Sequence, residues 1–177
     1  MLHPNKGNDR IIRALAELKD QIPNMKYLLV GSGPEKENLI KLAEELAMNN
    51  CVIFTGWLPY ESDVVDALRT ADIGLVMRIG QFSDNFHVTD TLSHEMACGL
   101  PILAARLKGF EGLIEENETG LLFDPADMEE FKTTLLQMYR QQDERIAMGK
   151  RAREKSIRAF DIELISSFQT EALLRLI

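Results

Sequence analysis

Hydrophobic residues along the chain form two kinds of pattern in turn. Residues 8–21 carry apolar positions at helical spacing, which predicts an amphipathic helix with Ile11, Ile12, Leu15 and Leu18 on one face. Residues 26–30 read Lys-Tyr-Leu-Leu-Val, a short, continuously apolar run typical of a strand buried on both faces. The alternation then continues. It predicts strands over 52–54, 73–77, 100–105 and 120–123, and helices over 35–48, 62–71, 90–97, 112–117, 126–140, 143–159 and 161–176.

Buried strands that alternate with amphipathic helices are typical of an α/β fold. We therefore expect a Rossmann-like, mostly parallel sheet of about 5–6 strands, with helices on both faces and the C-terminal helices packed on the sheet. No linker or internal repeat interrupts the pattern, so a single domain over 1–177 is expected. Ligands of such sheets bind beyond the carboxyl ends of the strands. The loops after residues 30, 54, 77 and 105 are therefore the ones to search for a site.

Composition narrows the function classes. The chain has 177 residues, 45% of them hydrophobic, and a formal net charge of −8. This apolar content excludes a disordered chain, and the acid excess argues against a nucleic-acid partner. The apolar runs are too short for a membrane span, and residues 1–7 lack the apolar core of a signal peptide. Cys51 and Cys98 stand alone, so we expect a cytoplasmic protein.

Two loops carry residues suited to phosphate binding. Gly31-Ser32-Gly33-Pro34 lies between a predicted strand and a predicted helix, where glycines let a ligand approach the backbone and a helix N-terminus attracts anions. A tight strand-to-helix turn would explain the same residues. Lys6 precedes the first helix, where its ammonium can reach a diphosphate. An exposed lysine without function is the alternative.

Glu95 is an acidic residue near the start of an otherwise apolar helix. A carboxylate at the carboxyl edge of the sheet can accept hydrogen bonds from two hydroxyls of a ribose or hexose. A carboxylate that only interacts with the helix dipole is the other interpretation. The sequence around Glu95 does not decide between the two.

The order of these pieces resembles a known family. The segments concerned are Pro4–Gly7, Leu29–Pro34, Val52–Trp57, Ala71–Ile73, Glu95–Pro101, Asn117–Leu122 and Met148–Gly149. Their spacing is similar to that in the C-terminal half of group 1 (family 4) glycosyltransferases of the GT-B fold. The resemblance runs from about Pro4 to the end of the chain. It implies a domain that binds a nucleotide-diphosphate sugar, with a UDP-, GDP- or ADP-sugar as donor.

The resemblance assigns roles to individual residues. Lys6 matches the lysine that contacts the diphosphate, and Glu95 matches the glutamate that holds the ribose. The remaining expected donor contacts are the glycine turn under the donor, the border of the base and the backbone that faces the phosphates: Gly31, Gly33, Trp57, Leu58, Thr91 and Leu92. The family retains the anomeric configuration and generally needs no metal, so we expect no cofactor.

One position departs from the family pattern. The first glutamate of the family's glutamate pair addresses the donor sugar, and His87 occupies its place here. His87 is therefore the candidate catalytic contact to the sugar, with Asp84 or Asp90 as substitutes if the loop is shifted. An exposed His87 without a role is the alternative. A metal site of His87, Asp90 and His94 is disfavoured, because the predicted helix begins only near Asp90 and the family offers no such metal.

The resemblance also implies parts that these residues do not contain. The family's donor half begins with a central strand that ends in Gly-Arg, directly before the lysine loop, whereas Met1 stands close to that loop here. We expect this gap to be filled by rearrangement or by a partner chain. The acceptor would bind an N-terminal acceptor domain or a partner chain, and the isolated chain would be inactive.

The sequence thus predicts the donor-binding half of a retaining glycosyltransferase, with an acceptor that is a glycan, a lipid or a small molecule. The alternatives are a non-catalytic nucleotide-sugar-binding or interaction domain, and one subunit of a two-chain transferase. A cluster of cations over residues 145–158 suggests peripheral membrane association. A solvated helix face would explain that cluster equally simply.

Overall fold

A computed structural model describes residues 1–79, 82–161, 163, 166–167, 170–171 and 174. The described strands are β1 (Tyr27–Val30), β2 (Val52–Gly56), β3 (Gly74–Val76), β4 (Ile102–Ala105) and β5 (Gly120–Phe123). The helices of this part are α1 (Asn8–Leu18), α2 (Lys36–Glu45), α3 (Glu61–Leu68), α4 (Asp90–Ala97), α5 (Met128–Arg140) and α6 (Gln142–Ala159). Short 3-10 turns are η1 (Pro4–Lys6), η2 (Phe82–Phe86) and η3 (Lys108–Phe110). The predicted α/β alternation is confirmed.

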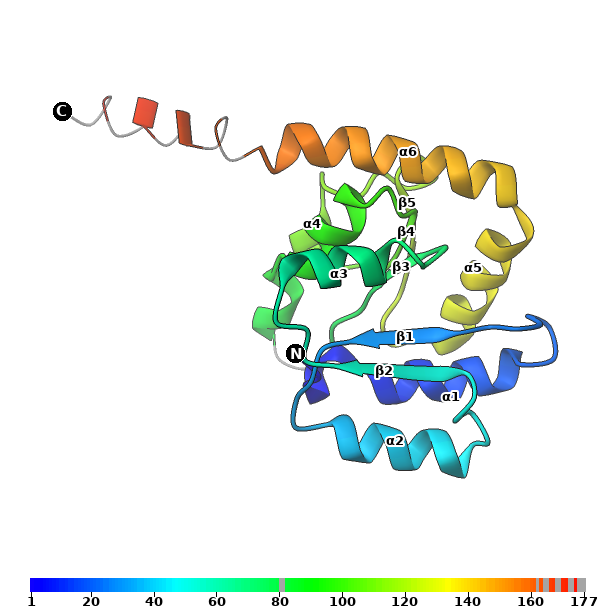
Figure 1. Cartoon of the computed structure of the whole chain (residues 1–177). Coiled ribbons are helices and arrows are strands. Elements are labelled where there is room, and N and C mark those ends of the chain that lie inside the picture. Colours follow the sequence, from blue (N-terminus) through cyan, green and yellow to red (C-terminus); the bar gives the residue numbers. More distant parts are fainter. Residues whose placement is uncertain (80–81, 162, 164–165, 168–169, 172–173, 175–177) are drawn as a thin grey trace.

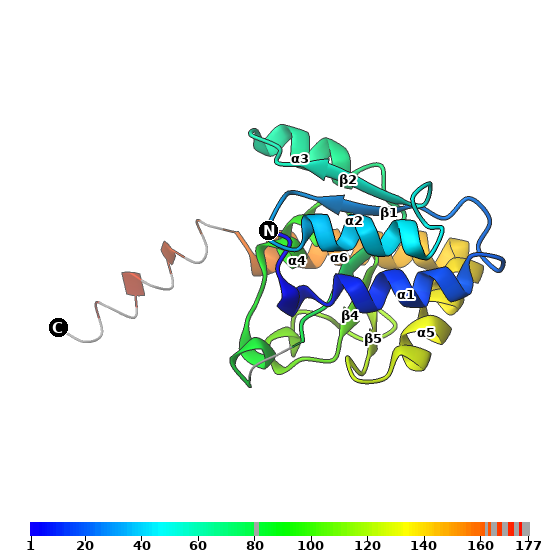
Figure 2. The same ribbon diagram turned by 90° about the horizontal axis from the view of Figure 1, so that it is seen from below.

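The strands form two parallel sheets rather than one. β1 pairs with β2, and β3, β4 and β5 pair in that order. The mostly parallel α/β architecture is confirmed, and no strand bridges β1 and β3 within the described residues, where the resemblance implied a central strand. The five described strands stand at the low end of the expected number. Helices cover both faces: α1 and α2 lie on one side of β1 and β2, and α3 lies on the other (Figures 1 and 2).

The core forms where the apolar pattern placed it. All four residues of β4 are buried, and so are the four stripe residues of α1. Phe123 of β5 and Phe131 of α5 pack edge to face with their ring centroids 5.1 Å apart. This contact fixes α5 against the sheet, while α6 crosses α4 and also touches β5. The C-terminal helices α5 and α6 are thus packed as expected.

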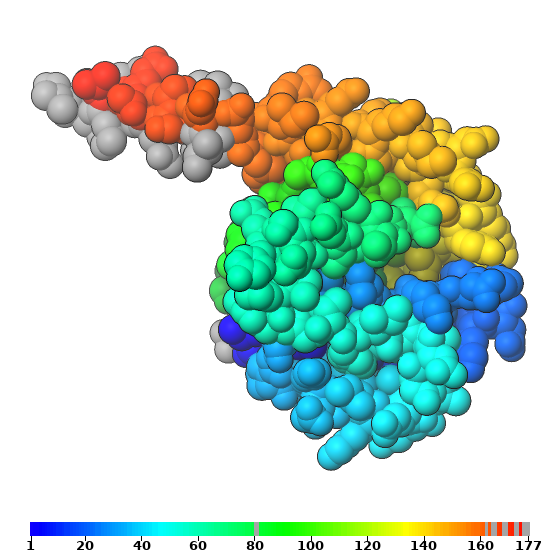
Figure 3. All heavy atoms as spheres, viewed as in Figure 1, coloured from blue at the N-terminus to red at the C-terminus, as the bar shows by residue number. Residues whose placement is uncertain are grey.

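Two of the predicted helices are not confirmed. The helix over 112–117 was wrong, because the chain makes the turn η3 earlier and then an irregular loop. Gly112 and Asn117 have φ angles of 76° and 66°, left-handed values that a continuous helix does not contain. The predicted helix over 161–176 falls largely outside the described residues. The described residues after α6 extend away from the body (Figures 1 and 3).

Candidate functional site

The carboxyl ends of the strands bring the predicted loops to one edge. The chain start lies beside the arrowheads of β1 and β2 (Figure 1), and the Leu2 N–H donates to the Ser32 carbonyl. The loop after β3 joins the same edge, because the Ile79 N–H donates to the Asn5 carbonyl. The segment that carries Lys6 is therefore fixed between the glycine turn and the loop after β3.

Lys6 lies half-buried among charged neighbours. Burial lowers the pKa of its ammonium, and the nearby positive charge of Arg78 lowers it further. Glu95, Asp90 and Asp84 act in the opposite direction through their negative charges. The structure thus brings Lys6 and Glu95, which are far apart in the sequence, into one electrostatic environment.

Arg78 is a site residue that the sequence analysis missed. It follows β3, and its guanidinium contacts the Asp84 carboxylate at 2.9 Å, with 12% and 14% of the two side chains exposed. Asn5 also donates to Asp84 at 2.9 Å. The Arg78 Nε is buried without a hydrogen-bond partner among the described residues. Its place directly after a strand, at the edge where such sheets bind ligands, was the signal available in the sequence.

Glu95 lies on α4, but it is the sixth of the eight residues of that helix rather than near its start, and its side chain faces the interior. Only 6% of the residue is exposed, and its Oε2 has no hydrogen-bond partner among the described residues. The Leu75 N–H donates to this carboxylate. Burial raises the pKa of Glu95 to about 8, against the opposing effects of the Leu75 N–H and Lys6.

Gly74 makes room for this carboxylate. A Cβ at Gly74 would lie 2.7 Å from the Glu95 Oε2, closer than real Cβ atoms approach. The glycine at the start of β3 therefore belongs to the same arrangement as Glu95.

The two glycines of the turn after β1 are needed for different structural reasons. Gly31 has a φ of 108°, a conformation that other residues rarely adopt. At Gly33 a Cβ would overlap the backbone of Leu2. The chain's own N-terminal segment therefore fills the space at Gly33. The sequence analysis had expected the donor in that space.

The residues after β2 remain accessible. Trp57 is 76% exposed and follows Gly56, whose φ is 71°. Leu58 beside it is partly buried. Both lie at the edge where the resemblance places the base of the nucleotide.

The candidate residues in the loop before α4 and in its first turn differ in their exposure. His87 is exposed after η2, and Asp90 and Thr91 are exposed in the first turn of α4. Leu92 is fully buried, and the Thr89 side chain already accepts from its N–H at 3.2 Å. Of the two predicted backbone contacts, Thr91 is therefore the better placed. Asp84 is occupied with Arg78 and Asn5, so it is a poor substitute for a sugar ligand.

No metal cluster forms from the candidates in the described part of the chain. Groups of three or more His, Cys, Asp or Glu side chains suited to a metal ion are absent from those residues. His94 instead lies 3.7 Å from the exposed Glu61 carboxylate. His87, Asp90 and His94 are thus not gathered around a common point.

Most cations of α6 are engaged within the protein. Arg145 pairs with Asp72 at 3.5 Å, Arg151 with Glu118 at 3.1 Å and Lys155 with Glu115 at 2.6 Å. Arg153 donates to the Ala97 carbonyl. These contacts favour the solvated helix face over a lipid-binding surface. The described helices also include none that is both long and apolar enough to cross a bilayer.

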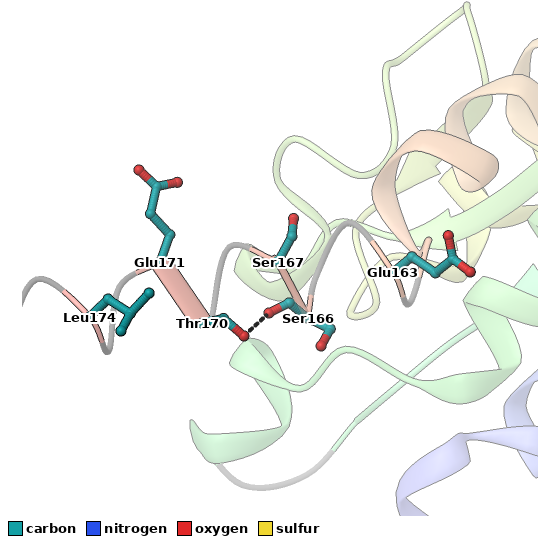
Figure 4. A pocket seen from close by; sticks show the side chains of 6 residues that line it. All are labelled: Glu163, Ser166, Ser167, Thr170, Glu171 and Leu174. Atoms are coloured by element: carbon teal, nitrogen blue, oxygen red, sulfur yellow. Dashed lines mark hydrogen bonds between the residues drawn. The ribbon is translucent and has the colours of Figure 1, made fainter.

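A hollow of about 690 Å³ lies along the C-terminal segment. Figure 4 shows that all six lining residues come from that one segment, with the Thr170 hydroxyl donating to the Ser166 carbonyl at 2.9 Å. It contains none of the predicted site residues and lies away from the sheet edge. The candidate site is therefore the edge that holds Lys6, Arg78 and Glu95.

Comparisons with known proteins agree on one family. The family model described as "Glycosyl transferases group 1" matches residues 1–155. A D-inositol 3-phosphate glycosyltransferase of Corynebacterium jeikeium is 32% identical over 154 residues, which are 83% of this chain and 35% of that protein. A lipopolysaccharide core biosynthesis glycosyltransferase of Rhizobium meliloti is 28% identical over 97% of this chain and 46% of its own length.

Solved structures share the fold. Anabaena HepE, crystallised with UDP and glucose, has a TM-score of 0.84 and 22% identity, and covers 98% of this chain and 46% of its own. The C-terminal domain of a group 1 glycosyl transferase from Francisella tularensis has a TM-score of 0.76 and 16% identity, over 91% of this chain and 83% of that domain. The chain thus spans less than half the length of the full-length relatives described here.

Proposed function

The chain belongs to the group 1 glycosyltransferases, and on that basis we propose that it is the half that holds a nucleotide-diphosphate sugar for transfer to an acceptor. Its α/β architecture is that of the C-terminal half of GT-B enzymes. The donor would lie across the carboxyl edge, with its diphosphate near Lys6 and its base near Trp57 and Leu58. UDP-, GDP- and ADP-sugars are the candidate donors.

The pair of cations at this edge is the observation that carries the proposal. Family members place an arginine beside the lysine on the diphosphate. Arg78 approaches Lys6 from the end of β3, closely enough for its charge to lower the pKa of Lys6. Two cations held together without a ligand repel each other, and a diphosphate would relieve that repulsion.

Arg78 also has unused bonding capacity. Its Nε is buried without a partner among the described residues, while one terminal nitrogen is held by Asp84. An unsatisfied buried donor is costly, so a phosphate oxygen at this nitrogen would be favourable. We assign Lys6 and Arg78 to the diphosphate together.

Glu95 would hold the ribose. Its Oε2 lacks a hydrogen-bond partner among the described residues, and ribose hydroxyls are suitable donors to it. Its present position against β3 requires the side chain to turn towards the edge on donor binding. Gly31 would leave the backbone open below the donor, and the first turn of α4 near Thr91 would face the phosphates.

The chemistry would depend on stabilising the leaving diphosphate. Negative charge develops on the departing nucleotide, and preorganised cations at that place lower the barrier. Lys6 and Arg78 would perform this role without a metal, and His87 would contact the donor sugar. We propose retention of configuration, with the acceptor bound by an acceptor domain or a partner chain. The free thiols of Cys51 and Cys98 fit the cytoplasmic location that we propose.

A non-catalytic nucleotide-sugar-binding domain is the second candidate. His87 at the place of the family's glutamate favours it, because an imidazole offers one acceptor where a carboxylate offers two oxygens. Donor binding without transfer, after the acceptor domain is supplied, would favour this alternative.

Calorimetric titration tests the proposed site. UDP, GDP, ADP and their sugar conjugates are titrated into the chain and into the variants Lys6→Ala and Arg78→Ala. We expect one base to be preferred, and each variant to weaken binding about tenfold or more, as the loss of a charge-assisted bond of about 1.5–3 kcal/mol implies. Lys41→Ala, on the exposed side of α2, is the matched control. Equal binding by Lys6→Ala and Lys41→Ala would refute the assignment.

A further inference from the structure

Asp84 joins the two segments that carry the cations of the candidate site. It lies in η2, and its Oδ1 accepts a hydrogen bond from the Arg78 guanidinium at 2.9 Å and another from the Asn5 side-chain amide at 2.9 Å. Asn5 directly precedes Lys6, and the Asn5 carbonyl accepts from the Ile79 N–H. One carboxylate oxygen thus connects the loop of Lys6 with the loop of Arg78.

The pair of Asp84 and Arg78 is largely withdrawn from solvent on both sides. An exposed ion pair exchanges among several arrangements and contributes little, because water solvates each charge separately. In a buried pair, the loss of one partner leaves the other charge without compensation, which is costly. Asp84 and Arg78 therefore hold each other in one arrangement.

This arrangement determines the direction of a free N–H group. The Arg78 Nη1 donates to Asp84, whereas the Arg78 Nε is buried and has no partner among the described residues. A guanidinium is planar and carries its N–H donors in a rigid fork. When Asp84 fixes Nη1, it also fixes the direction in which the Nε–H points.

Asp84 also acts on the repulsion between the two cations. The positive charge of Arg78 lowers the pKa of Lys6, and the negative charge of Asp84 opposes this effect. The carboxylate thus helps to keep Lys6 and Arg78 close together before a ligand arrives. A site that is arranged in advance loses less free energy to ordering when it binds.

The turn η2 is anchored independently of the Asp84 carboxylate. The Asn85 side chain accepts from the Lys108 N–H at 3.0 Å, which attaches η2 to η3. Gly109 lies so close to η2 that a Cβ there would be 2.8 Å from the Phe86 carbonyl. A substitution of the Asp84 side chain is therefore expected to change its contacts with the cations more than the turn itself.

We propose that Asp84 is a positioning residue for the diphosphate of the nucleotide sugar. Through Asn5 and Arg78 it holds the Arg78 Nε–H in the orientation that receives a phosphate oxygen, and it does not itself touch the ligand. This assignment rests on the proposed function, since it requires a diphosphate at Lys6 and Arg78. Orientation needs an acceptor oxygen at residue 84 rather than its negative charge.

A comparison of nucleoside diphosphates with nucleosides tests this role. UDP, GDP and ADP are titrated beside uridine, guanosine and adenosine, and the ratio of each pair of Kd values measures the contribution of the diphosphate. Asp84→Ala should lower this contribution about tenfold, as the loss of one charge-assisted bond implies, with nucleoside binding unchanged. Asp84→Asn keeps an acceptor oxygen and should stay within about threefold of the parent. Asp20→Ala, at an exposed position after α1, is the matched control.

The Nε–H resonance of Arg78 provides a second measurement. It is identified in 15N spectra by its absence from Arg78→Lys. Addition of inorganic pyrophosphate or of the preferred nucleoside diphosphate should shift it in the parent and in Asp84→Asn, but not in Asp84→Ala. If Asp84→Ala does not fold, Asp84→Asn decides, because loss of the shift in that variant refutes the assignment.

The remaining outcomes each overturn the assignment. An unchanged diphosphate contribution in Asp84→Ala would show that Arg78 is oriented without Asp84. A clearly larger contribution in both variants would mean that Asp84 acts only as a counter-charge, and a parallel loss of nucleoside binding would mean a general structural role. These three results leave the proposed function intact. Equal binding of diphosphate and nucleoside by the parent would refute the proposed function itself, and this assignment with it.

Discussion

Replacing Glu95 by glutamine should change how the stability of the protein depends on pH. In the folded protein, burial raises the pKa of Glu95 from its ordinary value of 4.5 to about 8. The folded state therefore binds this proton more tightly than the unfolded chain does. Stability from this group is fully present below pH 4.5 and is lost as the pH rises through about 8.

The size of the effect follows from the same values. One pKa unit corresponds to about 1.36 kcal/mol, so the gap between 4.5 and about 8 implies a loss of roughly 4–5 kcal/mol between acid and alkaline conditions. This is an upper limit, since the unfolding of part of the chain or water entry relieves the buried charge at lower cost. Glu95→Gln removes the charge, so its stability should lack this loss.

Urea unfolding followed by circular dichroism between pH 5 and pH 9 measures the difference. Glu95→Gln should match the parent near pH 5 and exceed its free energy of unfolding by several kcal/mol at pH 9. Glu44→Gln, at an exposed position of α2, should follow the parent throughout. If the parent and Glu95→Gln keep the same difference at every pH, the Glu95 carboxyl is not buried as described.

Further predictions concern packing, capping and the cluster at the site. Gly149→Ala should destabilise the protein by about 1–3 kcal/mol, because the new Cβ would overlap the Gly99 carbonyl where α6 crosses the chain; a thermal melt checks this, with Lys150→Ala on the exposed side as control. Thr89→Ala should cost about 1 kcal/mol in urea unfolding, since it removes the cap at the Leu92 N–H, and an unchanged midpoint would contradict the cap. Asp84→Asn should weaken the attachment of the loop after β3, which a faster exchange of the Ile79 amide would report.

Local patterns predicted the elements well and the relations between them less well. The stripe of α1 and the apolar run of β4 could be recognised in the sequence. Burial on one face of a helix leaves apolar residues at helical spacing, and burial on both faces of a strand leaves a continuous apolar run. The prediction of a helix over 112–117 failed because Gly112 has a left-handed φ angle. A count of apolar residues does not detect such a conformation. The division into two sheets follows from the lack of pairing between β1 and β3 among the described residues. The resemblance to the family pointed to this place, whereas the apolar pattern of the strands did not.

The sequence indicated which residues gather at one edge of the sheet, but not the direction in which their side chains point. The rule that ligands bind beyond the carboxyl ends of parallel strands pointed to the loop of Trp57, and the structure brings the loop of Lys6 to the same edge. The inward direction of Glu95 depends on Gly74 and Leu75, which touch it only in the folded chain. Arg78 was missed because a single loop cation is common in any sequence.

Chemical-shift mapping of a nucleotide-sugar complex tests the central claim most directly. UDP-, GDP- and ADP-sugars are added in turn to the 15N-labelled chain. The account predicts that one of them shifts the indole N–H of Trp57, the one tryptophan of the chain, together with the amides of Lys6, Gly31 and Thr91. Shifts elsewhere, or none with any of the three donors, would contradict the account.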